Sequence, residues 1–219
     1  MKCDLLSLNK ILENYEWGTI GAYDSDDIEI PFKVKTEDFL VFAKIDMQND
    51  DLHHQINAIS NIKRAIECQI DSLLIRFGLF SKSKKKHWTF PEKVEILNEI
   101  GIISPEFLRK INRYRNLMEH EYSIPDREKV EDGYDVASLF IKYTEKFLYN
   151  ALTKFELSNN GNEWCWVKFD YKQGKFTFED GMLGSQIIQE IGQDNPEYLQ
   201  YVKWFVSMIE KREKTKPSS

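Results

Sequence analysis

The sequence DDLHHQINAISNIKRAIECQIDSLLIRF, residues 50–77, decides the fold that we expect. Its apolar residues step by three and four along the chain, with Lys63 as the one interruption: Leu52, Ile56, Ile59, Ile66, Ile70, Leu73 and Phe77. This spacing places them on one face of a helix, because side chains three and four residues apart lie on the same side. The pattern therefore predicts one long amphipathic helix that ends at Gly78.

Three further helices are expected between residues 78 and 157, after a lysine-rich loop. The first two begin at prolines, which suit the first turn of a helix because the missing N–H has no partner there. The third ends before a proline, and the fourth has a wide apolar face. Their expected ranges are residues 91–100, 105–122 and 130–155. Four helices with short connections predict an antiparallel up-and-down bundle over residues 50–157.

The sequences on either side of this bundle show the period of two that is typical of strands. Before the bundle, a helix over residues 5–15 is followed by alternating apolar residues over 28–34 and 39–47. After it, residues 165–178 predict a hairpin, and a last amphipathic helix covers residues 196–210. A two-stranded hairpin is marginal alone, so we expect the strands of both flanks to join in one small sheet.

The predicted fold class is therefore mainly α, a helical bundle with a small accessory antiparallel β layer from the N- and C-terminal flanks. Residues 1–49 would supply a helix and strands, residues 50–157 the bundle, and residues 158–219 the hairpin and the last helix. The two flanking segments would pack together beside the bundle.

Composition limits the classes of function. The chain has 219 residues, 42% of them hydrophobic and 13% aromatic, which excludes a disordered or low-complexity scaffold. Its 30 basic and 36 acidic residues give a net charge of −6, so any contact with nucleic acid would be local. Cys3, Cys68 and Cys165 lack the spacing of a disulfide framework or a zinc site. With no apolar run of signal or membrane-span length, we expect a soluble, cytosolic protein.

The third expected helix carries a polar face that suggests chemistry. In FLRKINRYRNLMEHEY, residues 107–122, the side chains of Arg109, Arg113, Asn116 and His120 share one side of the helix. Imidazole titrates near neutral pH, and guanidinium groups match phosphate geometry. Such groups suit RNA cleavage, in which the 2′-OH attacks the neighbouring phosphorus after a base removes its proton. This reaction needs no metal or other cofactor.

Arg115 lies about 140° from His120 around a regular helix, so one helix does not bring both groups to the same phosphate. Either the helix distorts near its end, or a second copy supplies the missing group across a symmetric dimer. A plainer interpretation stays open. Arg115 could pair with Glu119 at i,i+4, and the charged face could be only a solvated face.

The run Arg-Asn-Leu-Met-Glu-His-Glu-Tyr, residues 115–122, resembles the Arg-x4-6-His signature of the HEPN superfamily. The surroundings are similar too, with a long first helix, a short second helix, the motif near the end of the third, and a fourth after a proline. The resemblance covers roughly residues 50–157, about half of the chain. It implies an all-α bundle that dimerises through its motif helices and forms a composite, metal-independent endoribonuclease site.

The resemblance also implies a role for each motif residue. Arg115 would bind or polarise the scissile phosphate, Asn116 would orient it or the histidine, and His120 would act as general base or acid, leaving a 2′,3′-cyclic phosphate. Such family members commonly serve as toxins or in defence against phage. The His-x-Tyr ending resembles HepT-like toxins, whose tyrosine is adenylylated by a partner nucleotidyltransferase. Tyr122 occupies that position, although it also fits a core-flanking aromatic residue.

The expected partners are RNA, a second copy of the chain, and an antitoxin or nucleotidyltransferase. Beside Arg109 and Arg113, substrate contacts could come from Lys84, Lys85 and Lys86 in the lysine-rich loop, although a solvated loop explains them as well. Two other functions stay open. The chain could be a non-catalytic HEPN-like interaction or nucleotide-binding module, or its function could lie in the β layer.

Overall fold

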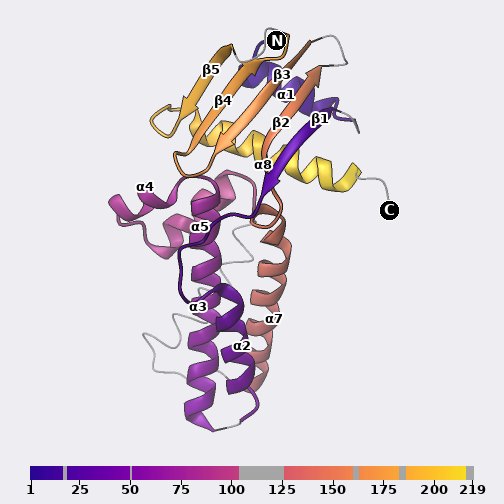
Figure 1. Cartoon of the computed structure of the whole chain (residues 1–219). Helices are drawn as coiled ribbons and strands as arrows, with labels where there is room; N and C mark the ends of the chain where they lie inside the picture. The colour runs from indigo at the N-terminus through magenta and orange to yellow at the C-terminus, as the bar shows by residue number, and fades with distance from the viewer. Residues whose placement is uncertain (17–18, 50, 104–125, 160–162, 183–185, 216–219) are drawn as a thin grey trace.

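The computed structural model describes residues 1–16, 19–49, 51–103, 126–159, 163–182 and 186–215. Figure 1 shows a sheet crossed by two helices at one end of the molecule and a group of long helices that extends away from it. The elements, in chain order, are α1 (Leu5–Glu13), β1 (Ile20–Asp26), α2 (Thr36–Asp46), α3 (Leu52–Arg76), α4 (Phe80–Lys85), α5 (Phe90–Glu99), α7 (Arg127–Thr144), η1 (Glu145–Phe147), β2 (Ala151–Asn159), β3 (Glu163–Asp170), β4 (Lys175–Asp180), β5 (Ile187–Gly192) and α8 (Tyr198–Thr215).

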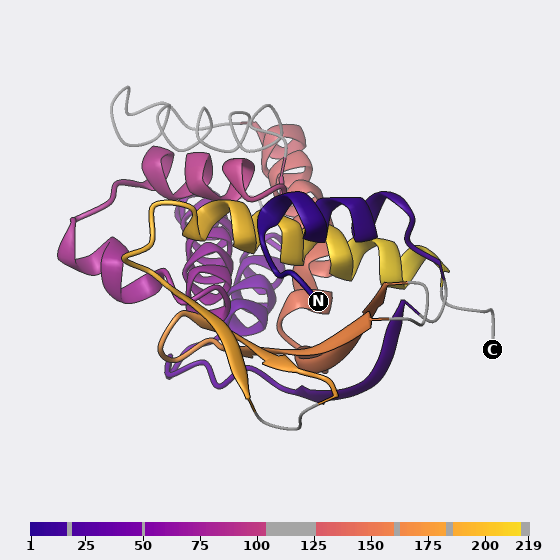
Figure 2. The same ribbon diagram turned by 90° about the horizontal axis from the view of Figure 1, so that it is seen from above.

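The predicted fold class is wrong, because the β layer is a main part of the structure. Five strands form one antiparallel sheet in the order β1-β2-β3-β4-β5. Helices α8 and α1 cover one face of this sheet (Figure 2). The protein therefore combines α and β structure, and is not a mainly-α bundle with a small accessory layer. The N-terminal flank does add a strand to the sheet of the C-terminal hairpin, but that strand is β1 and not either of the two that the sequence pattern predicts.

Strand β2 is the one that the sequence pattern assigns to the fourth helix. Helix α7 ends at Thr144, and after η1 the chain turns at Asn150, whose φ is 48°. A residue in this left-handed conformation cannot continue a right-handed helix. The Asn150 N–H donates to Asp27 Oδ1 at 2.8 Å, which fixes the turn. Ala151 and Phe155 keep a helical spacing by coincidence, so the expected helix over residues 130–155 is too long.

The two strands predicted over residues 28–34 and 39–47 are also wrong. The first stretch has no regular element, and the second belongs to helix α2. Thr36 and Ala43 are buried where α2 packs on α3, whereas Val41 and Ile45 on the opposite side are each 54% exposed. Apolar residues on both sides of a helix produce the alternation that is typical of a strand. The N-terminal strand is instead β1.

Several predicted elements are confirmed, with shifted ends. The long helix over residues 50–77 is α3, the helices over 5–15 and 91–100 are α1 and α5, and the last helix is α8. The predicted hairpin is formed by β3 and β4. The lysine-rich segment after Gly78 is not only a loop, because it contains the short helix α4.

The core under the sheet is aromatic. The ring of Phe205 on α8 stacks on Phe155 of β2, with centroids 5.9 Å apart, and contacts Phe176 of β4 at 5.6 Å. The neighbouring Trp204, whose ring lies 6.4 Å from that of Phe155, donates its Nε1–H to the Leu8 carbonyl of α1 at 3.2 Å. Helices α8 and α1 therefore pack against each other on the same face of the sheet.

A buried arginine joins the long helices to the sheet. Arg76, the last residue of α3, has no exposed surface, and its Nη2 donates to the Leu152 carbonyl of β2 at 2.7 Å. The rings of Phe77, Phe169 and Phe205 lie 5.6, 5.3 and 5.1 Å from its guanidinium carbon. Burial lowers the pKa of Arg76 to about 9. Among the described residues, its Nε and Nη1 have no hydrogen-bond partner.

A second, polar contact links α7 to α8. The Tyr143 hydroxyl donates to Glu210 Oε1 at 3.0 Å, and Lys146 Nζ lies 2.6 Å from the same oxygen. The ammonium group of Lys146 also lies 3.9 Å from the centroid of the Tyr143 ring. Partial burial and the Glu210 carboxylate raise the pKa of Tyr143 to about 12.

The glycine after the α3 helix gives a test of this joint. Gly78 has φ of 68°, and a Cβ there would lie 2.2 Å from the Gly174 Cα in the β3–β4 turn. Gly101 also has a positive φ, of 87°, but a Cβ would meet nothing within 4 Å, and Gly192 has neither constraint. We expect Gly78→Ala to lower the free energy of unfolding by at least about 3 kcal/mol, Gly101→Ala by about 1 kcal/mol, and Gly192→Ala by less than about 0.5 kcal/mol. Urea unfolding of the three variants measures this order. Equal losses for Gly78→Ala and Gly101→Ala would show that α3 does not press against the turn.

The Tyr143–Glu210 contact makes part of the stability dependent on alkaline pH. A phenol whose pKa is raised in the folded state stabilises fully below its unfolded value near 10, and this contribution is lost as pH rises to about 12. We therefore expect the free energy of unfolding of wild type, relative to that of Tyr143→Phe, to fall as the pH rises from about 9.5 to about 12. The lowered pKa of Arg76 makes its own contribution to stability rise with pH in this range. Because Arg76 is present in both proteins, this contribution cancels in the difference between them. Denaturant unfolding across this range, with Tyr23→Phe as the control, makes the measurement. A difference that is constant with pH would contradict the assignment.

Candidate functional site

The residues predicted to carry catalysis lie outside the part of the chain that the structure describes. Arg115, Asn116 and His120 fall within residues 104–125, as do Arg109, Arg113 and Tyr122. Of the predicted site residues, the structure places only Lys84, Lys85 and Lys86. The structure does describe the helices that precede and follow this segment.

The segment is entered from α5 and left through α7, and both helices pack against α3. Helix α5 begins where Glu92 Oε2 accepts the Thr89 N–H at 2.6 Å, and after it Ile102 is buried, with 2% exposed. Helix α7 begins at its N-cap Asp126, whose Oδ1 accepts the Lys129 N–H at 3.0 Å. Four residues further on, Val130 is 3% exposed. The core thus fixes the chain shortly before and shortly after the motif.

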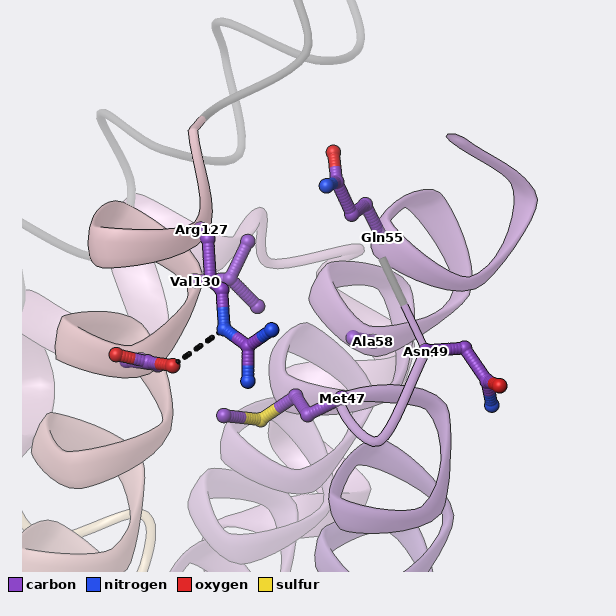
Figure 3. A pocket seen from close by; sticks show the side chains of 7 residues that line it. Met47, Asn49, Gln55, Ala58, Arg127 and Val130 are labelled. Carbon is purple, nitrogen blue, oxygen red and sulfur yellow. Dashed lines mark hydrogen bonds and ion pairs between the residues drawn. The ribbon is translucent and has the colours of Figure 1, made fainter. Parts of the chain in front are cut away.

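A small pocket lies beside the beginning of α7 (Figure 3). Its labelled residues come from the connection between α2 and α3, from the start of α3, and from α7: Met47, Asn49, Gln55, Ala58, Arg127 and Val130. The pocket has about 10 Å³ of free space, roughly what one water molecule needs. Arg127 Nε donates to Glu131 Oε1 at 2.8 Å along the same helix. This pocket is too small for a nucleotide.

A second cavity, of about 60 Å³, lies between the N-terminus of α2 and the middle of α3. Its wall includes the buried Gln69, whose Nε2 donates to Thr144 Oγ1 at 2.7 Å. It also includes Tyr149, whose hydroxyl donates to Glu37 Oε1 at 3.0 Å. The cavity has room for a few water molecules, and its polar groups are engaged in bonds between elements. We assign it to the packing of the helices.

The thiols do not have the environment of a nucleophile. Burial raises the pKa of Cys68. The Sγ atoms of Cys3 and Cys165 lie 3.8 Å apart in the core, and this contact together with burial raises the pKa of Cys165. The same contact lowers the pKa of Cys3, but Cys3 is buried, and a reactive cysteine needs an accessible thiolate.

The histidines at the beginning of α3 act as local capping partners. Asp51 accepts the His54 N–H at 3.2 Å and pairs with His54 Nδ1 at 2.5 Å, and these bonds lower the pKa of Asp51. The neighbouring His53 Nε2 lies 3.0 Å from Asn57 Nδ2. Within the described ranges, no group of three or more His, Cys, Asp or Glu side chains could hold a metal ion.

The lysines lie on a helix whose presence the sequence reasoning missed. Lys84 and Lys85 are in α4, Lys86 follows it, and all three are exposed, while Ser83 between them is buried. The available signal was the spacing of Leu79 and Ser83, which puts one apolar and one small residue on the same helical face. The structure therefore turns the predicted loop contacts into one defined surface.

Comparisons of the chain with protein families, with curated proteins and with solved structures gave no match. No helix in the described ranges is long and apolar enough to cross a membrane. The function must therefore be inferred from the residues and the frame described above.

Proposed function

We propose that the protein is a metal-independent endoribonuclease of HEPN type that acts as a homodimer. The observation that carries the proposal is the motif Arg115-Asn116 with His120, in the segment between α5 and α7. The described frame supports it. A helix of 25 residues, α3, is followed by two short helices, α4 of 6 residues and α5 of 10 residues, and the motif segment is followed by α7, of 18 residues. This order of long, short and long helices agrees with the resemblance.

The proposed reaction is an intramolecular transesterification. One imidazole removes the proton from the 2′-OH, whose oxygen attacks the neighbouring phosphorus while the bond from phosphorus to the 5′-oxygen breaks. The guanidinium of Arg115 stabilises the charge on the phosphoryl oxygens, and Asn116 orients the phosphate or the imidazole. The same imidazole, now protonated, gives this proton to the leaving 5′-oxygen. The products are a 2′,3′-cyclic phosphate and a 5′-hydroxyl end.

The angular separation of Arg115 and His120 makes a second copy of the chain part of the proposal. On a regular helix the two side chains point about 140° apart, so they do not converge on one phosphate. A two-fold axis beside the motif would place Arg115 of one copy opposite His120 of the other. Two such composite sites would then form in each dimer.

Cleavage of purified RNA in EDTA tests the reaction. We expect wild type to cut RNA and leave cyclic phosphate ends, and His120→Ala and Arg115→Ala each to lower the rate by about 100-fold or more, since each removes a group that acts in the transition state. Lys142→Ala, at an exposed lysine of α7, is the control and should cut as wild type does. End analysis of the products and the folding of each variant complete the measurement.

A mixed dimer tests whether the site is composite. When an Arg115→Ala chain is paired with a His120→Ala chain, one of the two sites regains both groups and the other loses both. We therefore expect purified heterodimers to recover about half of the wild-type rate, although each homodimer is inactive. No recovery from verified heterodimers would show that each site draws its arginine and histidine from one chain.

We further propose that the nuclease is the toxic half of a toxin–antitoxin or phage-defence system and works in the cytoplasm, where its RNA substrates are. Tyr122, two residues after His120, is the proposed position of adenylylation by a partner nucleotidyltransferase. A bulky, charged nucleotide at this spacing would obstruct the phosphate site. If unmodified wild type cuts no RNA, the alternative is a non-catalytic HEPN-like interaction or nucleotide-binding module.

A further inference from the structure

We propose that the α4 surface, formed by Lys82, Lys84, Lys85, Lys86 and His87, binds the phosphate backbone of single-stranded RNA. This inference deepens the proposed function, on which its choice of ligand rests. The sequence alone places these residues in a loop that could be merely solvated. The structure places them on and directly after a helix that is fixed to the end of α3 (Figure 1).

The α4 surface lies in a stretch from which acidic residues are excluded. Residues 72–91 contain four lysines, Arg76 and His87 but no aspartate or glutamate, although the chain has 36 acidic residues. Because Arg76 is buried, the exposed charge of this stretch comes from the lysines, with His87 exposed beside them. The result is a local positive surface on a protein of net charge −6.

The α4 lysines lack the carboxylate partner that several lysines on other elements have. On other elements, Lys142 pairs with Glu145 at 2.6 Å, Lys172 with Glu29 at 2.8 Å, and Lys175 with Glu190 at 2.9 Å. Within the described residues, no ion pair involves Lys82, Lys84, Lys85 or Lys86. Their ammonium groups are therefore available to a ligand of opposite charge.

The fold holds this surface in a defined conformation. Leu79 and Ser83 are buried, and the Leu79 N–H donates to the Leu74 carbonyl at 2.7 Å, which turns α4 away from α3. The Phe80 ring packs edge-to-face on Phe32, with centroids 5.8 Å apart, and lies 5.2 Å from Lys84 Nζ. These contacts fix the helix from the inside and leave Lys84, Lys85 and Lys86 exposed, with Lys82 half-buried.

The end of α4 is unusual in its choice of residue. His87 has φ of 53°, and the following Trp88 N–H donates to the Ser83 carbonyl at 3.0 Å. Glycine or asparagine usually occupies this left-handed position after a helix, because a side chain there adds strain. Histidine is among the side chains that adopt this conformation more often than most, and here it places an exposed imidazole next to Lys86 as a further donor to phosphate.

The form of the surface favours RNA over a membrane. Lysine ammonium groups are point charges that bind phosphates without reading sequence, and RNA supplies phosphates in a row. Membrane attachment by a basic surface usually also needs exposed apolar side chains that enter the interface. The apolar residues of this stretch face the core instead, since Leu79 is buried and Phe80 and Trp88 are half-buried.

Binding of a labelled single-stranded RNA, measured by fluorescence anisotropy, tests the proposal separately from cleavage. The background is His120→Ala, so that the RNA stays intact. The test variant adds Lys84→Ala, Lys85→Ala and Lys86→Ala. The control adds Lys142→Ala, Lys168→Ala and Lys172→Ala, which removes the same charge from exposed lysines with side chains 79%, 53% and 65% accessible.

We expect the test variant to bind RNA at least about tenfold more weakly than its parent at about 0.1 M salt. The slope of log K against log salt should fall in magnitude by about 2, because each of the three phosphate contacts removed contributes about 0.7. The control should stay within about twofold of its parent. Both should melt at the parent's temperature, since all six lysines are exposed. Equal weakening of test and control, or no weakening of either, would overturn the proposal.

Parallel assays distinguish failure of this surface from failure of the proposed nuclease. If wild type cuts no RNA but binding still depends on the α4 lysines, the nuclease proposal fails and the surface stands. If wild type cuts RNA, and the three lysine substitutions change neither cutting in the wild-type background nor binding in the His120→Ala background, the surface fails and the nuclease stands. Vesicles containing phosphatidylserine form the last arm, and α4-dependent binding to them without α4-dependent binding to RNA would overturn the RNA assignment.

Discussion

The structure depends on one buried charge, the guanidinium of Arg76. Removing this group from water is costly, and among the described residues no carboxylate offsets the cost. Its partners are instead the Leu152 carbonyl and the faces of three aromatic rings, Phe77, Phe169 and Phe205. A desolvated cation–π contact contributes about 2 kcal/mol, and a hydrogen bond to a charged donor about 1.5–3 kcal/mol. Since these groups come from β2, β3, α8 and the end of α3, the charge is tolerated only when the helices and the sheet are docked together.

This joint also determines where the α4 surface lies. Because Arg76 fixes the last turn of α3 against the sheet, the chain must leave at Gly78, where the approach of Gly174 leaves no room for a side chain. The Tyr198 hydroxyl donates to the Phe77 carbonyl at 2.7 Å and closes the same turn. Helix α4 starts two residues later, so its lysines are presented next to this constrained turn. A binding surface on a fixed element orders few groups when it binds, and this lowers the entropy cost.

Spacing along the sequence predicted the elements that are determined by residues close together in the chain. It did not predict the elements whose structure depends on contacts between distant segments. Helix α3 and the β3–β4 hairpin follow from spacing within a single segment. Strand β2 could not be found in this way, because its edges are satisfied by β1 and β3, which come from distant and later parts of the chain. Helix α2 was predicted as a strand because it has apolar residues on two faces, one packed on α3 and the other exposed. For the site, the sequence alone supplied Arg115, Asn116 and His120. It placed the lysines in a loop, because the burial of Leu79 and Ser83 that makes α4 a fixed helix is a tertiary effect.

Separate elements for binding and chemistry would suit the proposed ribonuclease, because the chain is acidic. A chain of net charge −6 repels RNA at long range, so attraction must come from a few concentrated charges. The α4 lysines would add to the basic residues of the motif segment, Arg109 and Arg113, a second set of positive charges on another element. In the proposed dimer each copy brings one α4 surface, and a strand that reaches both is held with the advantage of two linked contacts. Cleavage would then depend on the dimer twice, once for the composite site and once for holding the strand across it.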